Sequence, residues 1–407
     1  MKCGLLGRKL GHSYSPQIHA LLGNYSYQLF EKEPEEIGDF LKNGDFTGLN
    51  VTIPYKKEVI PFLDELSPAA ARLGAVNTIV RRDGKLIGHN TDYFGFRRLV
   101  QESGLQVAGK KVLVLGSGGA SSTAVAVLQE LGAKVTVISR SGENNYENLE
   151  RHADAAVIAN TTPVGMYPNT GKSALSLDGF PRLEGVLDAV YNPARTQILL
   201  DAEHRGLAAV NGLWMLVAQA KESAEWFTGE EIPDSRIAKI HHTLRLQMEN
   251  IILIGMPGCG KTAVGQQLAQ KLGKKFVDAD ESLEARVCRK ITDIIPNDGE
   301  AAFREMESET LAELGKQSGL VIATGGGCVT QPQNYPLLHQ NGTIFWLKRE
   351  LDKLPTDGRP LSQKGTLGQM YEARMPLYLR FADTAISNDG SIAETASAIC
   401  RKLEETT

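Results

Sequence analysis

The sequence predicts an α/β fold built from three α/β units. Short apolar segments alternate with helix-length segments along the 407-residue chain, and continuous apolar strands separated by helices are typical of parallel sheets covered on both faces. A chain of this length exceeds what one hydrophobic core normally holds, which indicates two or three domains. The 41 glycines agree with many tight turns between strands and helices.

The expected elements fall into three groups. Buried strands are predicted at residues 48–53, 112–115, 135–138, 156–159, 186–190, 251–254, 320–323 and 343–347. Helical periodicity is clearest in residues 120–131, 213–227, 263–272 and 299–316. Polar stretches near 100–110 and 232–249 predict domains at 1–103, 104–235 and 248–407, with a linker at 236–247. The helix at about 213–235 is expected to pack back on the first domain.

Composition and charge exclude several classes of protein. A net charge of −4 gives no electrostatic basis for binding nucleic acid or an anionic membrane. No apolar run approaches the roughly 18–20 residues of a membrane span, and residues 1–13 lack the apolar segment of a signal peptide. Five scattered cysteines favour reduced thiols in a cytoplasmic protein. The eight histidines form no H-x-x-x-H pattern, so a transition-metal site is not expected.

A complete phosphate-binding loop stands in the middle of the chain, after the start-like Met248 and an apolar strand. Gly255, Gly260, Lys261 and Thr262 satisfy G-x-x-x-x-G-K-[ST], in the strand-to-helix context that the motif requires. Lys261 is expected to neutralise the β- and γ-phosphates of ATP, and the Thr262 hydroxyl to ligate Mg²⁺. Because such loops usually begin a domain, the chain from Met248 onward is predicted to be a second protein fused behind a first.

Two carboxylates follow the next predicted strand. Asp278 and Asp280 lie at i and i+2 in FVDAD, where that strand ends. Paired carboxylates in this place can hold the magnesium shell, through water in the case of Asp278, and accept a proton from an alcohol. The alternative is a solvated turn, which the apolar strand leading into it disfavours. Cys259 presents its backbone to the loop and is not expected to be a catalytic thiol.

A second glycine-rich turn, GSGGAS at 116–121, joins a strand to an alanine-rich helix. Small residues there let backbone N–H groups and a helix N-terminus approach a pyrophosphate, which indicates a Rossmann-like NADP-binding or NAD-binding domain. Ser121 replaces the third glycine of the usual pattern, and a tight turn without ligand is the alternative. The next strand ends in Ser139, Arg140 and Ser141. A guanidinium pairs bidentately with a 2′-phosphate, so this ending favours NADP over NAD.

Ahead of that unit, polar side chains cluster at the ends of strand-like segments, where α/β folds gather ligand contacts. The segments HSYSP, NVTIPYK, GAVNT and HNTD contain Ser13, Ser15, Asn50, Thr52, Lys56, Asn77, Asn90 and Asp92. Individually they have structural explanations, since Ser13 could cap a helix and Asn77 or Asp92 could be turn residues.

Together with the glycine turn, DAVYNP and NGLWMLVAQA, this set resembles the shikimate dehydrogenase family over residues 1 to about 235. The resemblance implies Lys56 and Asp92 as the catalytic pair, because a lysine beside a carboxylate can protonate the alkoxide left by hydride transfer to a ketone. The implied substrate contacts are Ser13, Ser15, Thr52, Asn77, Asp92, Tyr191 and Gln219. The implied NADP(H) contacts are Gly116, Ser117, Gly118, Gly119, Ala120, Ser139, Arg140 and Ser141, with Ala189 and Gly212 beside the nicotinamide.

The second half carries its own set of motifs: FR with Glu307, TGGG at 324–327, GRPL with Arg359, and RMPLY with Arg374. A triple glycine after a strand permits very close approach of a ligand. Three separated arginines suit a small anionic acceptor and a phosphoryl-transfer transition state. Over residues 248–407, with their P-loop and predicted parallel sheet, these motifs resemble the shikimate kinase family.

The kinase resemblance assigns roles in the same way. It implies that Asp280, Arg304, Gly326 and Arg374 bind shikimate, with Asp280 as the base and the two arginines on the carboxylate. The implied ATP contacts are Gly258, Cys259, Gly260, Lys261, Thr262, Ala263, the lid residue Arg359, and Ser391 in the turn that borders the adenine. Lys261 is also implied as catalytic. The segment from Leu347 to Arg359 is shorter than usual, which would alter ATP affinity or lid closure.

The two resemblances imply consecutive reactions on one chain. The first is NADPH-dependent reduction of 3-dehydroshikimate to shikimate, and the second is MgATP-dependent phosphorylation of shikimate towards chorismate and the aromatic amino acids. Asn211, where many relatives have an acidic residue, and Tyr93 after Asp92 depart from the first family's pattern. They leave NAD against NADP, and quinate against shikimate, as open alternatives. A kinase-like domain that binds ligand without turnover is the alternative for the second half.

Overall fold

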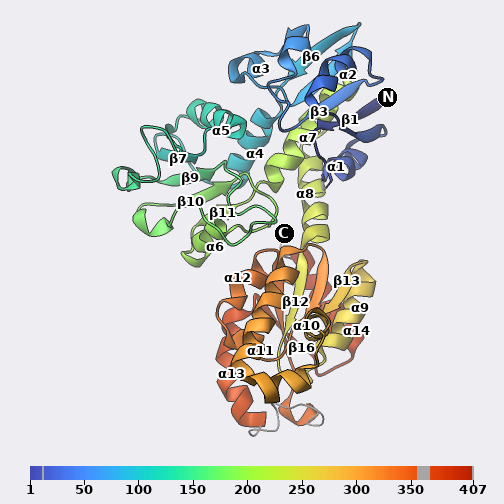
Figure 1. Cartoon of the computed structure of the whole chain (residues 1–407), viewed down its shortest axis with the longest axis vertical. Coiled ribbons are helices and arrows are strands. Elements are labelled where there is room, and N and C mark those ends of the chain that lie inside the picture. The colour runs from blue at the N-terminus through green and yellow to red at the C-terminus, as the bar shows by residue number, and fades with distance from the viewer. Residues whose placement is uncertain (12, 355–366, 406–407) are drawn as a thin grey trace. The chain divides into compact units, whose positions relative to one another are not determined.

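The computed structural model describes residues 1–11, 13–354 and 367–405, and the chain folds into two compact units (Figure 1). The first unit comprises residues 1–164, 173–191 and 198–243, and the second residues 165–172, 192–197 and 244–407. The predicted α/β class is confirmed, because sheets with helical connections make up both units. Short 3₁₀ turns are η1 Pro34–Glu36, η2 Ile60–Phe62, η3 Leu149–His152, η4 Leu177–Gly179, η5 Cys328–Thr330 and η6 Leu351–Lys353.

The first unit begins with a mixed sheet in the order β2-β1-β3-β5-β6-β4. Strand β1 runs parallel to β2 and β3, whereas β5 is antiparallel to β3 and β6. The strands are β1 Lys2–Gly7, β2 Ser26–Glu31, β3 Gly48–Val51, β4 Glu65–Leu66, β5 Thr78–Arg82 and β6 Lys85–His89. The accompanying helices are α1 Ser15–Leu22, α2 Ile37–Asn43 and α3 Pro68–Leu73. Leu6, Leu49 and Ile79 lie in the buried core of this sheet.

A second, fully parallel sheet in the first unit has the order β11-β10-β9-β7-β8. Its strands are β7 Lys111–Leu115, β8 Lys134–Ile138, β9 Val157–Asn160, β10 Gly185–Asp188 and β11 Ala208–Val210, with helices α5 Gly119–Glu130 and α6 Gln197–His204. Successive strand residues point to opposite faces. Accordingly, Val112 and Val114 of β7 enter one core, and Leu113 and Leu115 enter another.

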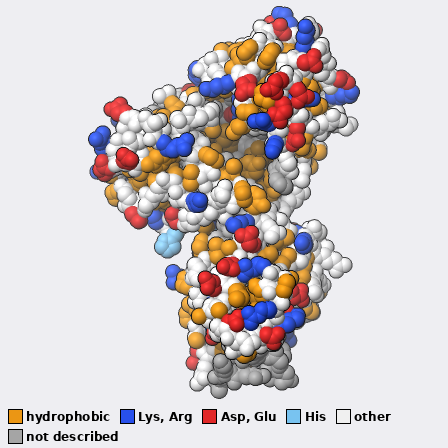
Figure 2. All heavy atoms as spheres, in the orientation of Figure 1, with side chains coloured by type: hydrophobic (Ala, Val, Ile, Leu, Met, Phe, Trp, Pro, Cys, Tyr) orange, Lys and Arg blue, Asp and Glu red, His pale blue; other side chains and the backbone are white. Residues whose placement is uncertain are grey.

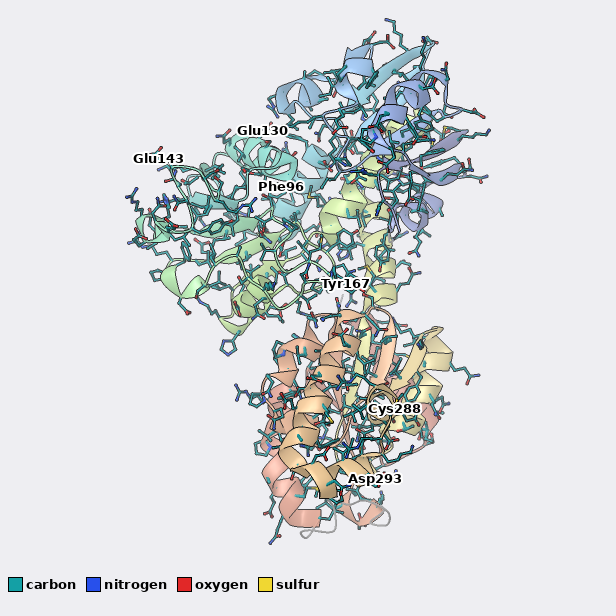
Figure 3. All side chains as sticks on the ribbon, viewed as in Figure 1. Phe96, Glu130, Glu143, Tyr167, Cys288 and Asp293 are labelled. Carbon is teal, nitrogen blue, oxygen red and sulfur yellow. The ribbon has the colours of Figure 1, made fainter. Side chains whose placement is uncertain are left out.

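Helices α4 (Asp92–Glu102) and α7 (Leu213–Thr228) connect the two sheets of the first unit. They pack so closely that a Cβ on Gly95 would lie 2.6 Å from the Met215 carbonyl oxygen. Helix α7 also contacts α1, β3 and β5, while α4 contacts α5. Figure 3 marks Phe96, which is buried within α4, and Glu130 of α5, whose carboxylate accepts a 2.8 Å hydrogen bond from Arg97. The first residue of α4, Asp92, is therefore held by elements on both sides.

The second unit is built on a parallel sheet in the order β13-β14-β12-β15-β16. Its strands are β12 Asn250–Ile254, β13 Lys275–Asp278, β14 Leu320–Ala323, β15 Gly342–Lys348 and β16 Thr384–Ser387. Its helices are α9 Lys261–Leu272, α10 Ala279–Val287, α11 Ile291–Lys316, α12 Asn334–His339, α13 Leu367–Phe381 and α14 Ile392–Glu405. Gly299 breaks α11 with φ 89° and ψ 164°, so the predicted helix at 299–316 corresponds to its second segment.

Residues 236–247, which the sequence analysis treats as a linker, are helical in the structure. Helix α8 spans Ser235–Met248, and its buried apolar residues are Ile237, Ile240, Leu244 and Met248. Spacings of three and four place such residues on one side of a helix. The neighbouring His241 stacks on Trp214, with ring centroids 3.7 Å apart. The division between the two units falls within this helix, between Thr243 and Leu244.

The surface carries charges of both signs. On the face shown in Figure 2, acidic and basic side chains are interspersed over each unit. Within residues 1–11, 13–354 and 367–405, no helix is long and apolar enough to cross a membrane. The same residues contain no group of three or more His, Cys, Asp or Glu side chains placed to hold a metal ion.

Candidate active sites

An ion pair between Lys56 and Asp92 forms the centre of the first unit's site. The Lys56 ammonium donates to Asp92 Oδ2 at 2.5 Å, with side chains 28% and 14% exposed. Lys56 follows β3, and its carbonyl accepts a 2.7 Å hydrogen bond from the Val76 N–H, which fixes the backbone of the turn. A half-buried ammonium held by a carboxylate can donate a proton to an oxygen that gains negative charge.

Two amide side chains lie close to one another beside this pair. Asn77 Oδ1 accepts a 2.7 Å bond from the Thr91 N–H, and Asn77 Nδ2 donates to Thr91 Oγ1 at 3.0 Å. The same Nδ2 lies 3.4 Å from Oε1 of Gln219 on α7. Because Thr91 precedes Asp92, these amides and the Lys56–Asp92 pair belong to one continuous stretch of structure.

The remaining substrate residues implied by resemblance come from three further places. Ser13 precedes α1, and its hydroxyl accepts a 3.2 Å bond from the Ser15 N–H. Thr52 follows β3, where its N–H donates to the Leu6 carbonyl at 3.0 Å. Tyr191 packs edge-on against Tyr14, with centroids 6.1 Å apart, which brings it next to the two serines.

The turn between β7 and α5 is a tight glycine turn with open space in front of it. Gly116 has φ +110°, a region that favours glycine. Ser121, in place of the third glycine, donates its hydroxyl to the Gly116 carbonyl at 2.7 Å and so closes the turn. A Cβ at Gly118 or Gly119 would meet nothing within 4 Å. This open space at the N-terminus of a helix fits a dinucleotide phosphate, and Ser117 and Ala120 belong to the same turn.

The other cofactor residues border the same sheet. A Cβ on Gly212 would lie 2.1 Å from the Ala189 carbonyl oxygen, so these two backbones are in direct contact. Ser139, Arg140 and Ser141 follow β8, and the Arg140 side chain is exposed. A cation at this strand end fits a 2′-phosphate better than an uncharged diol.

The phosphate loop of the second unit lies between β12 and α9. Gly255, Gly258 and Gly260 have φ of +145°, +84° and +98°, so the loop depends on glycine at all three. The Lys261 ammonium donates to the carbonyls of Gly255 and Met256 at 2.9 and 3.1 Å. In this conformation the Lys261 ammonium is bonded to carbonyl oxygens of its own loop, and phosphate oxygens of a nucleotide could replace them as its hydrogen-bond partners.

Two oxygen donors lie beside the loop. The Thr262 hydroxyl donates to Asp278 Oδ2 at 3.0 Å, and Asp278 Oδ1 accepts from the Asp280 N–H at 3.0 Å to cap α10. Hydroxyl and carboxylate oxygens are ligands that Mg²⁺ accepts, usually together with waters and substrate phosphates. The donor set therefore fits a magnesium ion held between this pair and a nucleotide.

Next to the loop is a cavity of about 420 Å³ that contains Asp280, Arg304, Glu307 and Arg374. Arg304 and Glu307 form a 2.8 Å ion pair whose side chains are only 7% and 3% exposed. Burial, the nearby Glu307 and Asp278 raise the pKa of Asp280 to about 6. Burial also raises the pKa of Glu307, although Arg304 opposes the shift. A carboxylate with a pKa near neutrality is suited to accept a proton from an alcohol.

The glycine-rich segment after β14 lies against both acidic and basic side chains of this cavity. A Cβ on Gly325 would lie 2.6 Å from Glu307 Oε1 and 2.9 Å from Asp280 Oδ1. The Gly326 carbonyl accepts bonds from Arg374 at 3.2 Å and from the Tyr378 hydroxyl at 2.5 Å. The cavity thus combines a base, two guanidinium groups and a phosphate loop within one pocket.

The kinase resemblance implies three further ATP contacts, Ser391, Ala263 and Arg359. Ser391 precedes α14, and its hydroxyl bonds Glu394 at 2.8 Å. Asn388, in the same turn, donates to the Cys259 carbonyl at 2.6 Å, which ties this turn to the phosphate loop. Ala263 lies in the first turn of α9. Arg359, predicted for the lid, lies outside the described residues.

Comparison with known proteins decides the family. A shikimate dehydrogenase (NADP(+)) from Clostridium perfringens is 38% identical over 264 residues, covering 60% of this chain and 97% of the relative. The chain belongs to the shikimate dehydrogenase family. A family model for the shikimate dehydrogenase substrate-binding domain matches residues 5–79, and one for shikimate kinase matches residues 257–404. The protein is therefore a bifunctional enzyme with a dehydrogenase half and a shikimate kinase domain.

Solved structures agree with the dehydrogenase half. A chorismate mutase/shikimate 5-dehydrogenase fusion protein from Clostridium acetobutylicum has TM-score 0.57 at 36% identity, covering 60% of this chain and 96% of that one. Shikimate 5-dehydrogenase from Thermus thermophilus, in complex with NADP(H) and shikimate, has TM-score 0.54 at 30% identity, covering 60% and 99%. Both alignments extend over nearly the whole of the shorter relative.

Several residues of the two sites were not singled out by the sequence analysis. In the dehydrogenase half they are Thr78, Thr91 and Ser223, which contact Asn77 and the helix of Gln219. In the kinase domain Tyr378 shares the Gly326 carbonyl with Arg374. The spacing of four residues places Ser223 on the same side of α7 as Gln219, but the contacts of Ser223 and Thr78 depend on how helix and strands pack.

Proposed function

We propose that the chain reduces 3-dehydroshikimate to shikimate with NADPH in residues 1–235, and then phosphorylates the 3-hydroxyl of shikimate with MgATP in residues 248–407. The proposed domains are 1–103 for the dehydrogenase substrate, 104–235 for NADP(H), and 236–247 as the connecting segment. The proposal rests on finding both sites in one chain. One half contains the Lys56–Asp92 ion pair, and the other contains a phosphate loop beside a cavity lined by two arginines.

In the first reaction NADPH supplies a hydride to the ketone carbon when bound. Lys56 then gives a proton from its ammonium to the ketone oxygen, which becomes a hydroxyl, and Asp92 holds the lysine in place. Ser13, Ser15, Thr52, Asn77, Tyr191 and Gln219 are proposed to orient the substrate. The turn at 116–120, the Ser139–Ser141 segment, Ala189 and Gly212 are proposed to bind the cofactor.

In the second reaction the shikimate hydroxyl loses its proton to Asp280, and its oxygen forms a bond to the γ-phosphorus while ADP leaves. Arg304 and Arg374 are proposed to bind the substrate carboxylate, and Gly326 to contact the substrate through its backbone. Residues 258–263, Arg359 and Ser391 are proposed to hold ATP. When bound, Mg²⁺ beside Thr262 and Asp278 would neutralise phosphate charge.

A coupled assay tests both steps in the full-length chain. Incubation with 3-dehydroshikimate, NADPH and MgATP should yield shikimate 3-phosphate, whereas quinate and NADH serve as comparison substrates. Lys56→Ala should slow NADPH oxidation by at least about 100-fold and leave phosphorylation of added shikimate unchanged. The exposed neighbour Lys57→Ala is its matched control.

The corresponding kinase variant is Lys261→Ala. It should lower phosphorylation by about 100-fold to 1,000-fold, because a cation on the developing phosphate charge is lost, and it should spare NADPH oxidation. Lys275→Ala, an exposed lysine of the same domain, is the control.

Two results would contradict the proposed roles. Near-normal NADPH oxidation by Lys56→Ala would contradict the role proposed for that lysine. ATP binding without ADP formation by the unmodified chain would favour a non-catalytic kinase domain instead.

A further inference from the structure

Behind Asn77 and Gln219 lies a cluster of three buried hydroxyls. Ser223 Oγ is 2.8 Å from Thr78 Oγ1 and 2.9 Å from Thr91 Oγ1, and the two threonine oxygens are 3.2 Å apart. Ser223 and Thr78 are completely buried and Thr91 is 2% exposed. The cluster joins helix α7, strand β5 and the residue that precedes Asp92.

The Ser223 hydroxyl has four polar atoms within hydrogen-bond distance, more than it can bond at one time. A hydroxyl offers one proton and two lone pairs, which allows three hydrogen bonds. Asn50 Nδ2 must donate to Ser223 Oγ, at 2.8 Å, and the Gln219 carbonyl must accept from it, at 2.9 Å. One lone pair is left for the two threonine hydroxyls, so only one of them can donate to Ser223.

Two arrangements of the threonine protons agree with the distances. In the first, Thr78 donates to Ser223 Oγ at 2.8 Å and accepts from Thr91 Oγ1 at 3.2 Å. The second begins from Thr91. Thr91 Oγ1 already accepts from Asn77 Nδ2 at 3.0 Å, and its shortest remaining acceptor is Ser223 at 2.9 Å. Thr78 can instead donate to Asn77 Oδ1 at 3.2 Å while it accepts the second Asn50 Nδ2 proton, also at 3.2 Å. Both arrangements give every hydroxyl proton and both Asn50 amide protons an acceptor. In both, Ser223 Oγ accepts a proton from a threonine, and Thr91 Oγ1 keeps a lone pair for Asn77 Nδ2.

Backbone groups fix the orientation of the two amides, and the hydroxyl cluster supports the Asn77 amide from behind. Asn77 Oδ1 accepts from the Thr91 N–H, so its Nδ2 must point to Thr91 Oγ1 and towards Gln219 Oε1. Gln219 Nε2 donates to the Leu216 carbonyl at 2.9 Å, which leaves a second proton of that amide to a ligand. The Asn77 Nδ2 bond also needs a lone pair of Thr91 Oγ1, which is available because the Thr91 proton is directed into the hydroxyl cluster that contains Ser223.

The network also extends to the serine end of the site. The Tyr27 hydroxyl donates to Asn50 Oδ1 at 2.8 Å, and Tyr27 is a hydrogen-bond partner of Ser15. Asn50 therefore has both Oδ1 and Nδ2 engaged, and its amide cannot turn over without breaking several bonds. Ser223 closes this network at the end that holds Asn77.

We propose that Ser223 is a positioning residue of the dehydrogenase site, whose hydroxyl holds Thr78 and Thr91 in the arrangement that supports the Asn77 amide beside Gln219. Ser223 does not touch the substrate, since its side chain is fully buried. The proposal rests on the proposed dehydrogenase reaction, in which the two amides bind the substrate.

The test is Ser223→Ala in the full-length chain, assayed as shikimate oxidation with NADP⁺. The KM for shikimate should rise about tenfold, the effect of losing roughly one ordinary hydrogen bond to substrate orientation, with kcat within about twofold. The KM for NADP⁺ and the kinase rate of the same sample should not change. Thr228→Ala is the matched control, because Thr228 makes the same kind of bond on α7, to the Ala224 carbonyl at 2.9 Å.

A double-mutant comparison separates positioning from general destabilisation. If Ser223 acts through Asn77, Ser223→Ala should change KM less than about twofold in an Asn77→Ala background, because coupled residues are not additive. Three outcomes would overturn the proposal. The effects of Ser223→Ala and Asn77→Ala on KM could multiply in the double variant, or Ser223→Ala could leave KM unchanged. The third outcome is a fall in kcat in proportion to a fall in the melting temperature.

Two further arms keep the test decisive. Thr91→Val, which removes the neighbouring hydroxyl, should give the same split between KM and kcat and carries the test if Ser223→Ala does not fold. An unmodified chain that fails to oxidise shikimate would refute the proposed function, whereas an active chain with a normal Ser223→Ala variant would refute only this inference.

Discussion

The two active sites of this chain keep their polar groups in place by different means. In the dehydrogenase half the groups near the Lys56–Asp92 pair are neutral amides and hydroxyls, and Asn77, Thr78 and Thr91 among them are buried and hydrogen-bonded to one another. In the kinase domain the corresponding groups are charged, with Arg304, Glu307 and Asp280 lining one cavity. Neutral networks hold their geometry as pH changes, whereas a cluster of buried charges changes whenever one member gains a proton. The activity of the kinase domain should therefore depend more strongly on pH, and on the loss of single charged groups, than the activity of the dehydrogenase half.

The largest effect is expected from Gly325→Ala. The new methyl group would lie 2.6 Å from Glu307 Oε1 and 2.9 Å from Asp280 Oδ1, so both carboxylates must move. Misplacing a base by about 1 Å costs on the order of 100-fold in rate, and phosphorylation of shikimate measures it. Gly368→Ala, where a Cβ meets nothing within 4 Å, is the control. An active Gly325→Ala enzyme would show that Asp280 does not act from its observed position.

Acid should lower kinase activity by about tenfold at pH 5. Asp280 has its pKa raised to about 6 by burial and by Glu307 and Asp278, and only its deprotonated form can accept the hydroxyl proton. One unit below the pKa roughly a tenth of the molecules carry that form. The measurement is kcat/KM for shikimate against pH, with dehydrogenase activity of the same samples as a check on folding. A flat profile between pH 7 and pH 5 contradicts the assignment.

Glu307→Gln should shift the loss of kinase activity in acid to lower pH. Glu307 is a like charge that raises the Asp280 pKa, so removing its charge stabilises the Asp280 carboxylate and lowers its pKa. The KM for shikimate should rise severalfold at the same time, because Arg304 loses its buried 2.8 Å partner. Glu305→Gln, an exposed carboxyl on the same helix, should leave both quantities unchanged. A midpoint that rises would refute the charge coupling.

The smallest effect is expected from Arg140→Ala. The exposed guanidinium after β8 is proposed to pair with a 2′-phosphate, so the KM for NADPH should rise about twofold to threefold, because an exposed ion pair contributes roughly 0.5 kcal/mol. The KM for NADH should be unaffected. Arg151→Ala is an exposed control in the same unit. Equal effects on both cofactors would mean that Arg140 does not read the phosphate.

The sequence predicted those parts of the fold that continuous local patterns encode. The apolar runs around 112–115 and 251–254 became β7 and β12, because strands buried on both faces must be apolar throughout. The first sheet was largely missed beyond β3. Its β2 is mostly exposed and β4 has only two residues, so neither carries a continuous apolar run. Helix α8 was missed because its apolar residues are isolated among polar ones.

The sites divide in the same way. Lys56, Asp92 and the phosphate loop could be located from the sequence, since short motifs fix them, and the structure brings Lys56 and Asp92 within 2.5 Å. The role of Ser223 could not, because its partners Asn50, Thr78 and Thr91 come from three other elements. Such a network exists only after strands pair and helices pack, and no local pattern records it.

The backbone contact between Gly212 and Ala189 restricts which amino acids can occupy position 212. Its Cβ position lies 2.1 Å from a backbone oxygen, which unlike a side chain cannot rotate aside. A library that encodes all twenty amino acids at residue 212 should therefore return only glycine codons among clones that retain dehydrogenase activity, while a parallel library at Gly118 should return several. Such a screen would show by its surviving codons where the main chain alone leaves no room for a side chain beside the proposed nicotinamide position.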